Sequence, residues 1–556
     1  MGRLLTDRRM LIVLDNARDA EQVRPLLPGA AGCLALVTSR DQMSGLVAAE
    51  GAHILALDLL SVTEAQQLMR QRLGDDRVSP SPDAINDIIT SCARLPIALA
   101  IAAARAASRP DFPIEYLAKE LADARGGLES FSGPDIATDL RAVFTCSYRT
   151  LRPETTRVFR ALSVHPGPDL AAPTIASLAG VAMQRIQPML AELTEAHLLT
   201  EHTPGRYVLH DLLRAYAAEL LNSHNSHTAR HGATRRLLDH YLHTAHTAAL
   251  LLHPNRDPIS LAAPLPGVTV TTLTTYAQAM AWFTSEHAAL VASLDRATET
   301  GLDVHASRLA WSLEEFFYLR ENWHDYAASQ TIALGAVRRL GDTAGQAHTH
   351  RTLASAYIQQ GRVDDARVHF QRSIDLYGEL SDLVGQGHAH RGLSWLYQHH
   401  GPHEQALRHA EESLVLFQAA QHHSGLALAL NNIGWVHALL GDYRTTLTYC
   451  WQALTIQQQI SDAHGQANTW DSLGYANHHL GHYRQAIACY EHALDLRRKA
   501  GHRTGIASTL VHIGHTHHMT GDRDAAREAW HHALVILDEL DLPDADSVRD
   551  QLSLVS

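Results

Sequence analysis

Three short apolar runs, each followed by a charged residue, stand near the start of the chain. Met10–Leu14 is followed by Asp15, Cys33–Ser39 is followed by Arg40, and His53–Leu57 forms the third run. Apolar runs of this length predict strands that are buried in a parallel sheet. Polar side chains at the carboxyl ends of such strands lie where parallel sheets bind ligands. The first 60 residues therefore predict an α/β region.

Helical patterns replace the strands after residue 60. Ser61 and Glu64 form a capping-box pattern, which predicts a helix that starts there and runs to Leu73. Two further helices are predicted over 83–93 and 95–107.

The stretch from 138 to 221 predicts three helices and a hairpin. The helices are expected over 153–164, over 173–179 and up to Ala196, and the hairpin turns around Gly205. This order is typical of a winged helix. Residues 222–300 predict a helical connector with an irregular stretch around 254–266.

From residue 345 onward the pattern repeats every 40 residues. Two glycine series keep this interval: Gly345, Gly385, Gly425, Gly465, Gly505, and Gly361, Gly401, Gly441, Gly481, Gly521. Seven residues before each glycine of the second series stands a small residue: Ala354, Ser394, Gly434, Gly474, Gly514. Another small residue recurs five positions after each glycine of the second series: Ala366, Ala406, Thr446, Ala486, Ala526. So regular a period predicts a solenoid of stacked helix pairs, A and B, that pack closely at the small residues.

These repeats resemble tetratricopeptide repeats of a lengthened, 40-residue kind. Residues 302–340 predict a degenerate leading repeat, and 542–554 predict a C-terminal cap. The glycines at 361 and its equivalents are expected to end helix A in the left-handed conformation. The fold class predicted for the chain is mainly α, with a right-handed α-solenoid following the partial α/β region and the winged helix.

The resemblance also implies a groove lined by the A helices, with two rows of side chains that bind a protein or peptide partner. The polar row is Arg351, Arg391, Asn431 and Asp471, and the aromatic row is Trp395, Trp435 and Tyr475. Aromatic rings with polar edges are effective anchors for a peptide. The alternative is that these rings pack against the next repeat and bind nothing.

Composition and charge exclude several classes of function. The net charge of −13 argues against broad electrostatic binding to nucleic acid or to anionic membranes. The five cysteines lack CxxC spacing, which predicts a reducing, cytoplasmic setting without a disulfide or zinc framework. Adjacent histidines such as His399 and His400 point about 100° apart on a helix and cannot chelate one ion, so no metal site is predicted.

Four motifs in the first 211 residues stand in a recognisable order. Residues 12–16 (IVLDN) resemble a Walker B strand, 37–40 (VTSR) a sensor motif, 94–99 (RLPIAL) a GLPLA motif and 207–211 (YVLHD) an MHD motif. Together they resemble the NB-ARC nucleotide-binding module of signal-transduction ATPases. With the repeats, the arrangement is similar to bacterial transcriptional regulators of the AfsR/SARP type.

The resemblance implies a role in ADP binding for four residues. Asp15 would orient Mg²⁺, Arg40 would contact the γ-phosphate, Pro96 would pack beside adenine, and His210 would touch the β-phosphate of ADP. Each has a local alternative, because Asp15 and Arg40 can cap strand ends, Pro96 can begin a helix and His210 can cap one.

The sequence departs from this family at the phosphate site. It contains no GxxxxGK[ST] motif, and Asn16 stands where a second acid often follows Asp15. We therefore expect no ATP hydrolysis, hence no enzyme activity, and binding of ADP or ATP with Mg²⁺ that is weak or lost. Either the start is internal to a longer gene, or this is a trimmed descendant.

The predicted domains are a partial NB-ARC α/β remnant over 1–60, its helical subdomain over 61–135, a winged helix over 136–221, a connector over 222–300 and the repeats over 301–556. Residues 183–221 contain three arginines and five acidic residues, and this negative balance argues against direct DNA binding. We expect a regulatory signalling protein whose repeats bind a protein or peptide partner. The alternatives are an ATPase switch completed by upstream sequence, or a DNA-binding transcriptional regulator.

Overall fold

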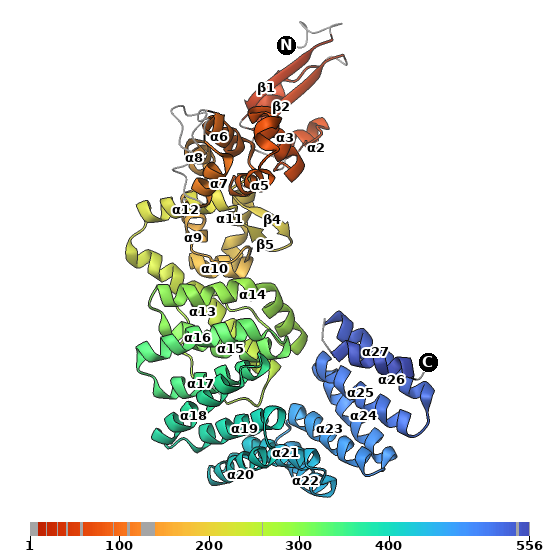
Figure 1. Ribbon diagram of the computed structural model, residues 1–556. Coiled ribbons are helices and arrows are strands. Elements are labelled where there is room, and N and C mark those ends of the chain that lie inside the picture. The colour runs from red at the N-terminus through yellow and green to blue at the C-terminus, as the bar shows by residue number, and fades with distance from the viewer. Residues whose placement is uncertain are drawn as a thin grey trace. The chain divides into compact units, whose positions relative to one another are not determined.

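The computed structural model describes residues 9–17, 19–29, 32–39, 43–55, 59–92, 94–107, 110, 112–123, 140–257, 259–540 and 544–554. The chain divides into two compact units (Figure 1). The first comprises Met1–His240 with Pro264–Val270, and the second comprises Tyr241–Ala263 with Thr271–Ser556.

The first unit begins with two parallel strands, β1 (Leu11–Ala17) and β2 (Leu34–Ser39), in which Leu11 pairs with Leu34. Two predicted strands are thus confirmed. Their full burial is wrong, because Leu11 and Leu34 are 61% and 67% exposed and only the opposite face packs against neighbouring helices. The third predicted strand is also wrong where the structure describes it, since residues 53–55 carry no strand and 56–57 lie outside the described residues.

Short helices surround and follow these strands. They are α1 (Ala20–Val23), η2 (Arg24–Leu26), α2 (Ser44–Glu50), α3 (Val62–Leu73), α4 (Asp75–Val78), α5 (Pro82–Ser91), α6 (Pro96–Ala107) and α7 (Ile114–Asp123). The capping box of α3 is confirmed: Ser61 Oγ accepts from the Glu64 N–H at 3.2 Å, and the Glu64 carboxylate accepts from the Ser61 N–H at 2.8 Å. Helix α3 packs on α6, and α5 packs on α7.

The predicted helices and hairpin between 138 and 221 are confirmed as elements. They are α9 (Pro153–Leu162), α10 (Ala172–Ala179), α11 (Met183–Glu195) and the hairpin of β4 (Thr200–Thr203) and β5 (Arg206–Val208). The structure adds α8 (Leu140–Thr150), β3 (Leu170–Ala171) and α12 (Asp211–His224). The three strands form an antiparallel sheet in the order β3-β5-β4. Strand β3 was not predicted, because two residues give no readable periodicity. The winged-helix assignment remains a prediction.

The expected connector over 222–300 is divided between the units. Helix α13 (His227–Leu252) runs from the first unit into the second, and α14 (Tyr276–Glu299) packs on the first helix of the repeats.

The second unit is a stack of helix pairs. The A helices are α15 (Asp303–Leu319), α17 (Thr343–Gln359), α19 (Leu383–His400), α21 (His423–Leu439), α23 (Ala463–His479) and α25 (Arg503–Met519). The B helices are α16 (Trp323–Leu340), α18 (Val363–Glu379), α20 (His403–Ala419), α22 (Tyr443–Gln459), α24 (Tyr483–Ala500) and α26 (Arg523–Glu539), and α27 (Asp544–Leu554) follows them. Consecutive A helices from α17 to α25 contact one another along the stack. The prediction of a mainly α chain with a repeat solenoid is confirmed (Figure 1).

The small residues allow the A and B helices to approach each other closely. A Cβ added to Gly474 would lie 2.5 Å from the ring of Tyr490, and one added to Gly514 would lie 2.4 Å from Trp530. The left-handed glycine is confirmed at four of its five positions, for example at Gly441 with φ 83°. It is wrong at Gly401, where φ is −160°, because Pro402 follows and restricts the preceding residue to an extended conformation.

Among the described residues, no helix combines the length and the apolar character that crossing a membrane would require.

Candidate partner-binding site

The predicted nucleotide residues are only partly described. Asp15 is exposed near the end of β1, and its carboxylate accepts a hydrogen bond from Thr38 of β2. Arg40 lies outside the described residues. Pro96 is exposed and begins α6, and His210 stands at the N-cap of α12 without making a side-chain capping bond. A nucleotide site at these residues remains a prediction.

The surface formed by the A helices of the repeats, here termed the A-helix face, carries both predicted rows. Trp435 and Tyr475 are half-buried and contact each other across α21 and α23, with ring centroids 5.0 Å apart. Trp395 packs against a buried cluster that includes Phe370. The aromatic row therefore contributes to packing between repeats and also keeps part of its ring surface exposed.

The polar row divides into two kinds of residue. Arg351 and Arg391 are half-buried, and the Nε atom of each is buried without a hydrogen-bond partner among the described residues. Burial and the neighbouring Arg351 guanidinium both lower the pKa of Arg391. These two arginines are cationic groups on the A-helix face with unused donors.

The other two members of the row are engaged by the stack itself. The Asn431 side chain accepts a hydrogen bond from the Cys450 thiol. Asp471 is only 8% exposed and pairs with Arg497 at 3.4 Å and with His512 at 3.3 Å. The structure therefore corrects the expectation that Asp471 lines an open groove, because a carboxylate buried at this interface must be paired with a cation from the neighbouring helices.

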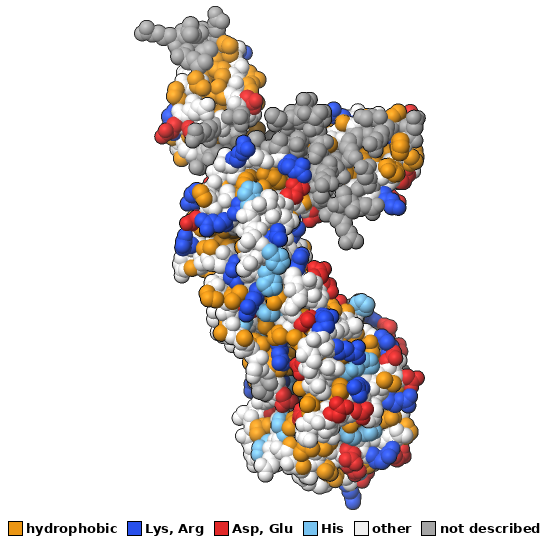
Figure 2. Space-filling model, turned by 90° about the vertical axis from the view of Figure 1, so that its left-hand side faces the viewer, with side chains coloured by type: hydrophobic (Ala, Val, Ile, Leu, Met, Phe, Trp, Pro, Cys, Tyr) orange, Lys and Arg blue, Asp and Glu red, His pale blue; other side chains and the backbone are white. Residues whose placement is uncertain are grey.

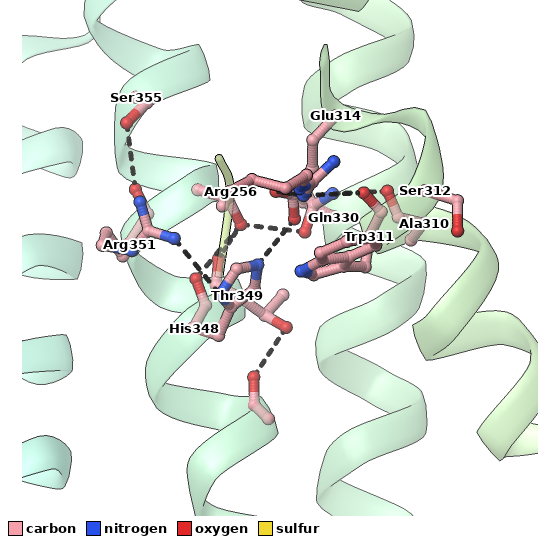
Figure 3. A network of polar contacts seen from close by, with 12 residues as sticks. Arg256, Ala310, Trp311, Ser312, Glu314, Gln330, His348, Thr349, Arg351 and Ser355 are labelled. Atoms are coloured by element: carbon pink, nitrogen blue, oxygen red, sulfur yellow. Dashed lines mark hydrogen bonds and ion pairs between the residues drawn. The ribbon is translucent and has the colours of Figure 1, made fainter. Parts of the chain in front are cut away.

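Residues 253–257, which we call the crossing segment, lie against this face, and their sequence pattern predicted no role for them. Arg256 lies over the ring of Trp311, with its guanidinium carbon 3.3 Å from the centroid (Figure 3). It also forms an ion pair with Glu314 at 3.0 Å, in which both side chains are 9% exposed. Burial by itself raises the pKa of Glu314, but His348 and Arg256 lower it, so that it carries a charge that holds Arg256 in place.

The next residue of the crossing segment, Asp257, reaches a different pair of repeats. Its carboxylate lies 3.0 Å from His388 Nε2 of α19 and 3.2 Å from His422 Nε2, at the N-cap of α21. Burial alone raises the pKa of Asp257, but hydrogen bonds from the two imidazoles hold it well below its usual range. At the start of the segment, His253 lies 3.5 Å from Glu315 and its ring is 5.6 Å from that of His464.

Asp257, His388 and His422 also have ligand spacing for a metal ion, with one ligand atom from each within 4.8 Å of the others. The hydrogen bonding of His422 instead favours an imidazole that donates a hydrogen bond to Asp257. The Gly425 N–H donates to His422 Nδ1 at 3.0 Å, which leaves the ring proton on the Nε2 that faces Asp257. A metal at Nε2 would need that proton on Nδ1, where it would break the helix cap. At His422 the geometry therefore fits an imidazole that donates to the Asp257 carboxylate better than a metal ligand.

One sequence signal could have revealed the crossing segment. The N-cap residue of the A helices is aspartate at positions 342, 382 and 462, where it accepts from a glycine N–H. At position 422 histidine makes the same bond. An aspartate there would repel Asp257. Histidine also stands at this position in the last repeat, as His502, so the signal narrows the search to two places and does not identify one.

Comparison with known proteins agrees with this architecture. Residues 345–419 and 425–499 match the model of the tetratricopeptide repeat. These two stretches are therefore tetratricopeptide repeats.

The chain is also similar in sequence to regulatory protein AfsR. It is 34% identical over 381 residues to the protein from Streptomyces coelicolor and 33% identical over 375 residues to that from Streptomyces griseus. Each alignment covers 67% of this chain and 38% of the relative, so the chain spans well under half the length of these relatives.

Solved structures show weaker similarity. A signal-transduction ATPase with a tetratricopeptide-repeat sensor from Pyrococcus horikoshii is 16% identical, with a TM-score of 0.38 over 98% of this chain and 77% of that one. The quorum sensor NprR from B. thuringiensis is 13% identical, with a TM-score of 0.35 over 50% of this chain and 84% of that one. Similarity at this level carries no argument about function.

Proposed function

We propose that this chain is a regulatory protein that binds an extended segment of a protein partner on its A-helix face. The observation that carries the proposal is the pair Arg351 and Arg391, whose buried Nε atoms have no hydrogen-bond partner among the described residues. Buried donors of this kind are costly unless a ligand satisfies them. A carboxylate is the group that best satisfies a guanidinium, because its two oxygens accept two parallel hydrogen bonds.

The aromatic row supports the same proposal. Trp435 and Tyr475 present partly exposed rings on α21 and α23, the A helices that follow those of the arginines, and such rings are frequent anchors at protein interfaces. On the face drawn in Figure 2, acidic and basic side chains are interspersed among the described residues. That face therefore carries a mixture of charges, and the proposal rests on the anchors of the A-helix face.

The experiment compares partner capture by the wild-type chain and by a face variant, Arg391→Ala with Trp435→Ala and Tyr475→Ala, from a bacterial lysate with quantitative mass spectrometry. Proteins retained by the wild-type chain should be lost from the face variant. Loss of anchor residues typically costs about 2 kcal/mol or more each, so the loss should exceed tenfold.

Trp451→Ala is the matched control, because Trp451 is 49% exposed on the B helix α22. This variant should retain the same proteins as the wild-type chain. Equal retention by the face variant, with an unchanged circular dichroism spectrum, would contradict the proposal.

A nucleotide switch is the second candidate function. It is supported by Asp15 and Thr38, which meet near the carboxyl ends of parallel strands, where such sheets bind ligands. Titration calorimetry with ADP, and with ATP plus Mg²⁺, tests it directly. Micromolar binding that Asp15→Asn abolishes would support a retained switch, whereas no heat of binding would remove it. We expect no hydrolysis in either case, since the sequence contains no P-loop motif.

Direct DNA binding has less support. Glu192 of α11 is held by Arg152 at 2.8 Å, so a carboxylate lies on the helix that would otherwise approach phosphates. A gel shift at physiological salt is expected to show no complex.

A further inference from the structure

The crossing segment has the contacts of a bound peptide. Its residues reach α15, α19, the N-cap of α21 and α23, which are all A helices or their caps. Residues 253–257 belong to the same compact unit as these helices but precede them in the chain, and they contain no helix. They therefore lie on the A-helix face as an irregular segment that contacts several repeats at once.

Two adjacent side chains carry most of this recognition. Arg256 combines the cation–π contact with Trp311, the ion pair with Glu314 and a hydrogen bond of 3.2 Å to the Trp311 carbonyl (Figure 3). A guanidinium desolvated over an indole ring and paired with a carboxylate is recognised specifically, since lysine has neither the planar shape nor the fork of donors.

Asp257 is the second anchor, and its surroundings are complementary in charge. Besides the two imidazoles of His388 and His422, the guanidinium groups of Arg351 and Arg391 act on the same carboxylate through space. The two arginines that support the proposed function are therefore neighbours of an acidic group already held on this face.

We propose that residues 253–257 are an internal ligand of the A-helix face, and that the external partner presents the same arginine–aspartate pair in an extended chain and competes with it. This inference rests on the proposed function and names its ligand chemistry. A tethered segment acts at a high effective concentration, in the millimolar range for a short linker, so an external peptide binds well only when the internal one is released.

A labelled synthetic peptide with the sequence of residues 252–260 tests this competition by fluorescence anisotropy. The wild-type chain should bind it weakly. The full-length double variant Arg256→Gln with Asp257→Asn, which removes both charges and keeps both side chains polar, should bind it at least tenfold more tightly. A peptide with alanine at both positions should bind neither chain.

Arg367→Gln with Asp364→Asn is the matched control, because it removes an exposed arginine–aspartate pair on α18. This control should bind the peptide as weakly as the wild-type chain. A melting curve provides a second readout if the double variant is destabilised: the unlabelled peptide should raise its melting temperature and leave that of the wild-type chain unchanged.

The outcomes separate this inference from the proposed function. Equal affinity of the wild-type chain and the double variant, or binding of the alanine peptide, would overturn the internal ligand. Absence of peptide binding to any of the chains would also overturn the internal ligand. If the face variant still loses partner capture in that case, the proposed function remains supported. Partner capture that survives in the face variant would refute the proposed function, whatever the peptide does.

Discussion

The repeats from 343 to 419 and those from 423 to 500 share one backbone but differ at the A-helix face. Ten residues before the glycine that follows helix A, the earlier repeats carry Arg391 with an unused donor, whereas the later ones carry Asp471 in a buried network. One residue earlier, His350 and His390 stand where Leu430 and Trp470 follow. The 40-residue period thus determines where the helices approach each other. The side chain at each repeat position determines whether the A-helix face can bind a ligand there or whether that position is already paired with neighbouring helices.

The largest expected difference lies between Arg391 and Asp471, which occupy the same position in two repeats. Asp471→Ala leaves Arg497, which is 8% exposed, without its ion-pair partner, and breaking a buried pair costs about 3–5 kcal/mol. Arg391→Ala breaks no ion pair among the described residues and should change the free energy of unfolding by less than about 1 kcal/mol. Urea unfolding followed by circular dichroism measures both. Equal losses would refute the division into an open and a closed part.

The shared backbone predicts that replacing the equivalent glycines Gly385 and Gly465 costs the same stability. A Cβ at Gly385 would lie 2.3 Å from the Tyr377 ring, and one at Gly465 would lie 2.3 Å from the Asp462 carboxylate. Gly385→Ala and Gly465→Ala should each destabilise the repeats by about 1–3 kcal/mol through overpacking.

Gly378→Ala is the control for this pair. Gly378 lies in α18 with no atom within 4 Å of an added Cβ, so alanine should stabilise the helix by up to about 1 kcal/mol. Thermal melting distinguishes the three variants. Tolerance of alanine in one group of repeats alone would show that the backbones differ.

A smaller difference should appear on acidification. His350 Nδ1 lies 2.9 Å from His369 Nδ1, and burial together with the neighbouring ring lowers the pKa of His350 to about 4. His390 and His409 form the equivalent pair at 3.1 Å, and the same causes lower the pKa of His409 to about 4.

Because these pKa values are depressed in the folded protein, the stability they contribute is present above the unfolded value of 6.5 and is lost as the pH falls from 6.5 towards 4. The loss should be roughly 1 kcal/mol for each pair at pH 5, allowing for their partial exposure. Hydrogen exchange at pH 7 and pH 5, corrected for intrinsic rates, should show earlier opening of α17–α20. His350→Leu with His390→Leu, which copies Leu430, should abolish that difference; an unchanged pH dependence would contradict it.

The sequence predicted the period, the helix pairs and the close approaches between helices. These features depend on the size of single residues, such as Gly474 at the contact between helices A and B. It failed where the outcome depends on a neighbour. Gly401 loses its left-handed conformation because of Pro402, and Leu11 and Leu34 lie in strands with one open face. The crossing segment was beyond prediction from periodicity, since residues 253–257 have no regular structure and their contacts with the A helices lie 55 to 211 residues away in the chain.

The most direct test of the central claim is hydrogen exchange of the full chain with and without a captured partner. Binding on the A-helix face should protect α17, α19, α21 and α23, which carry Arg351, Arg391, Trp435 and Tyr475, and should increase exchange in residues 253–257 as the partner displaces them. Protection confined to the B helices, or to the first unit, would contradict the claim.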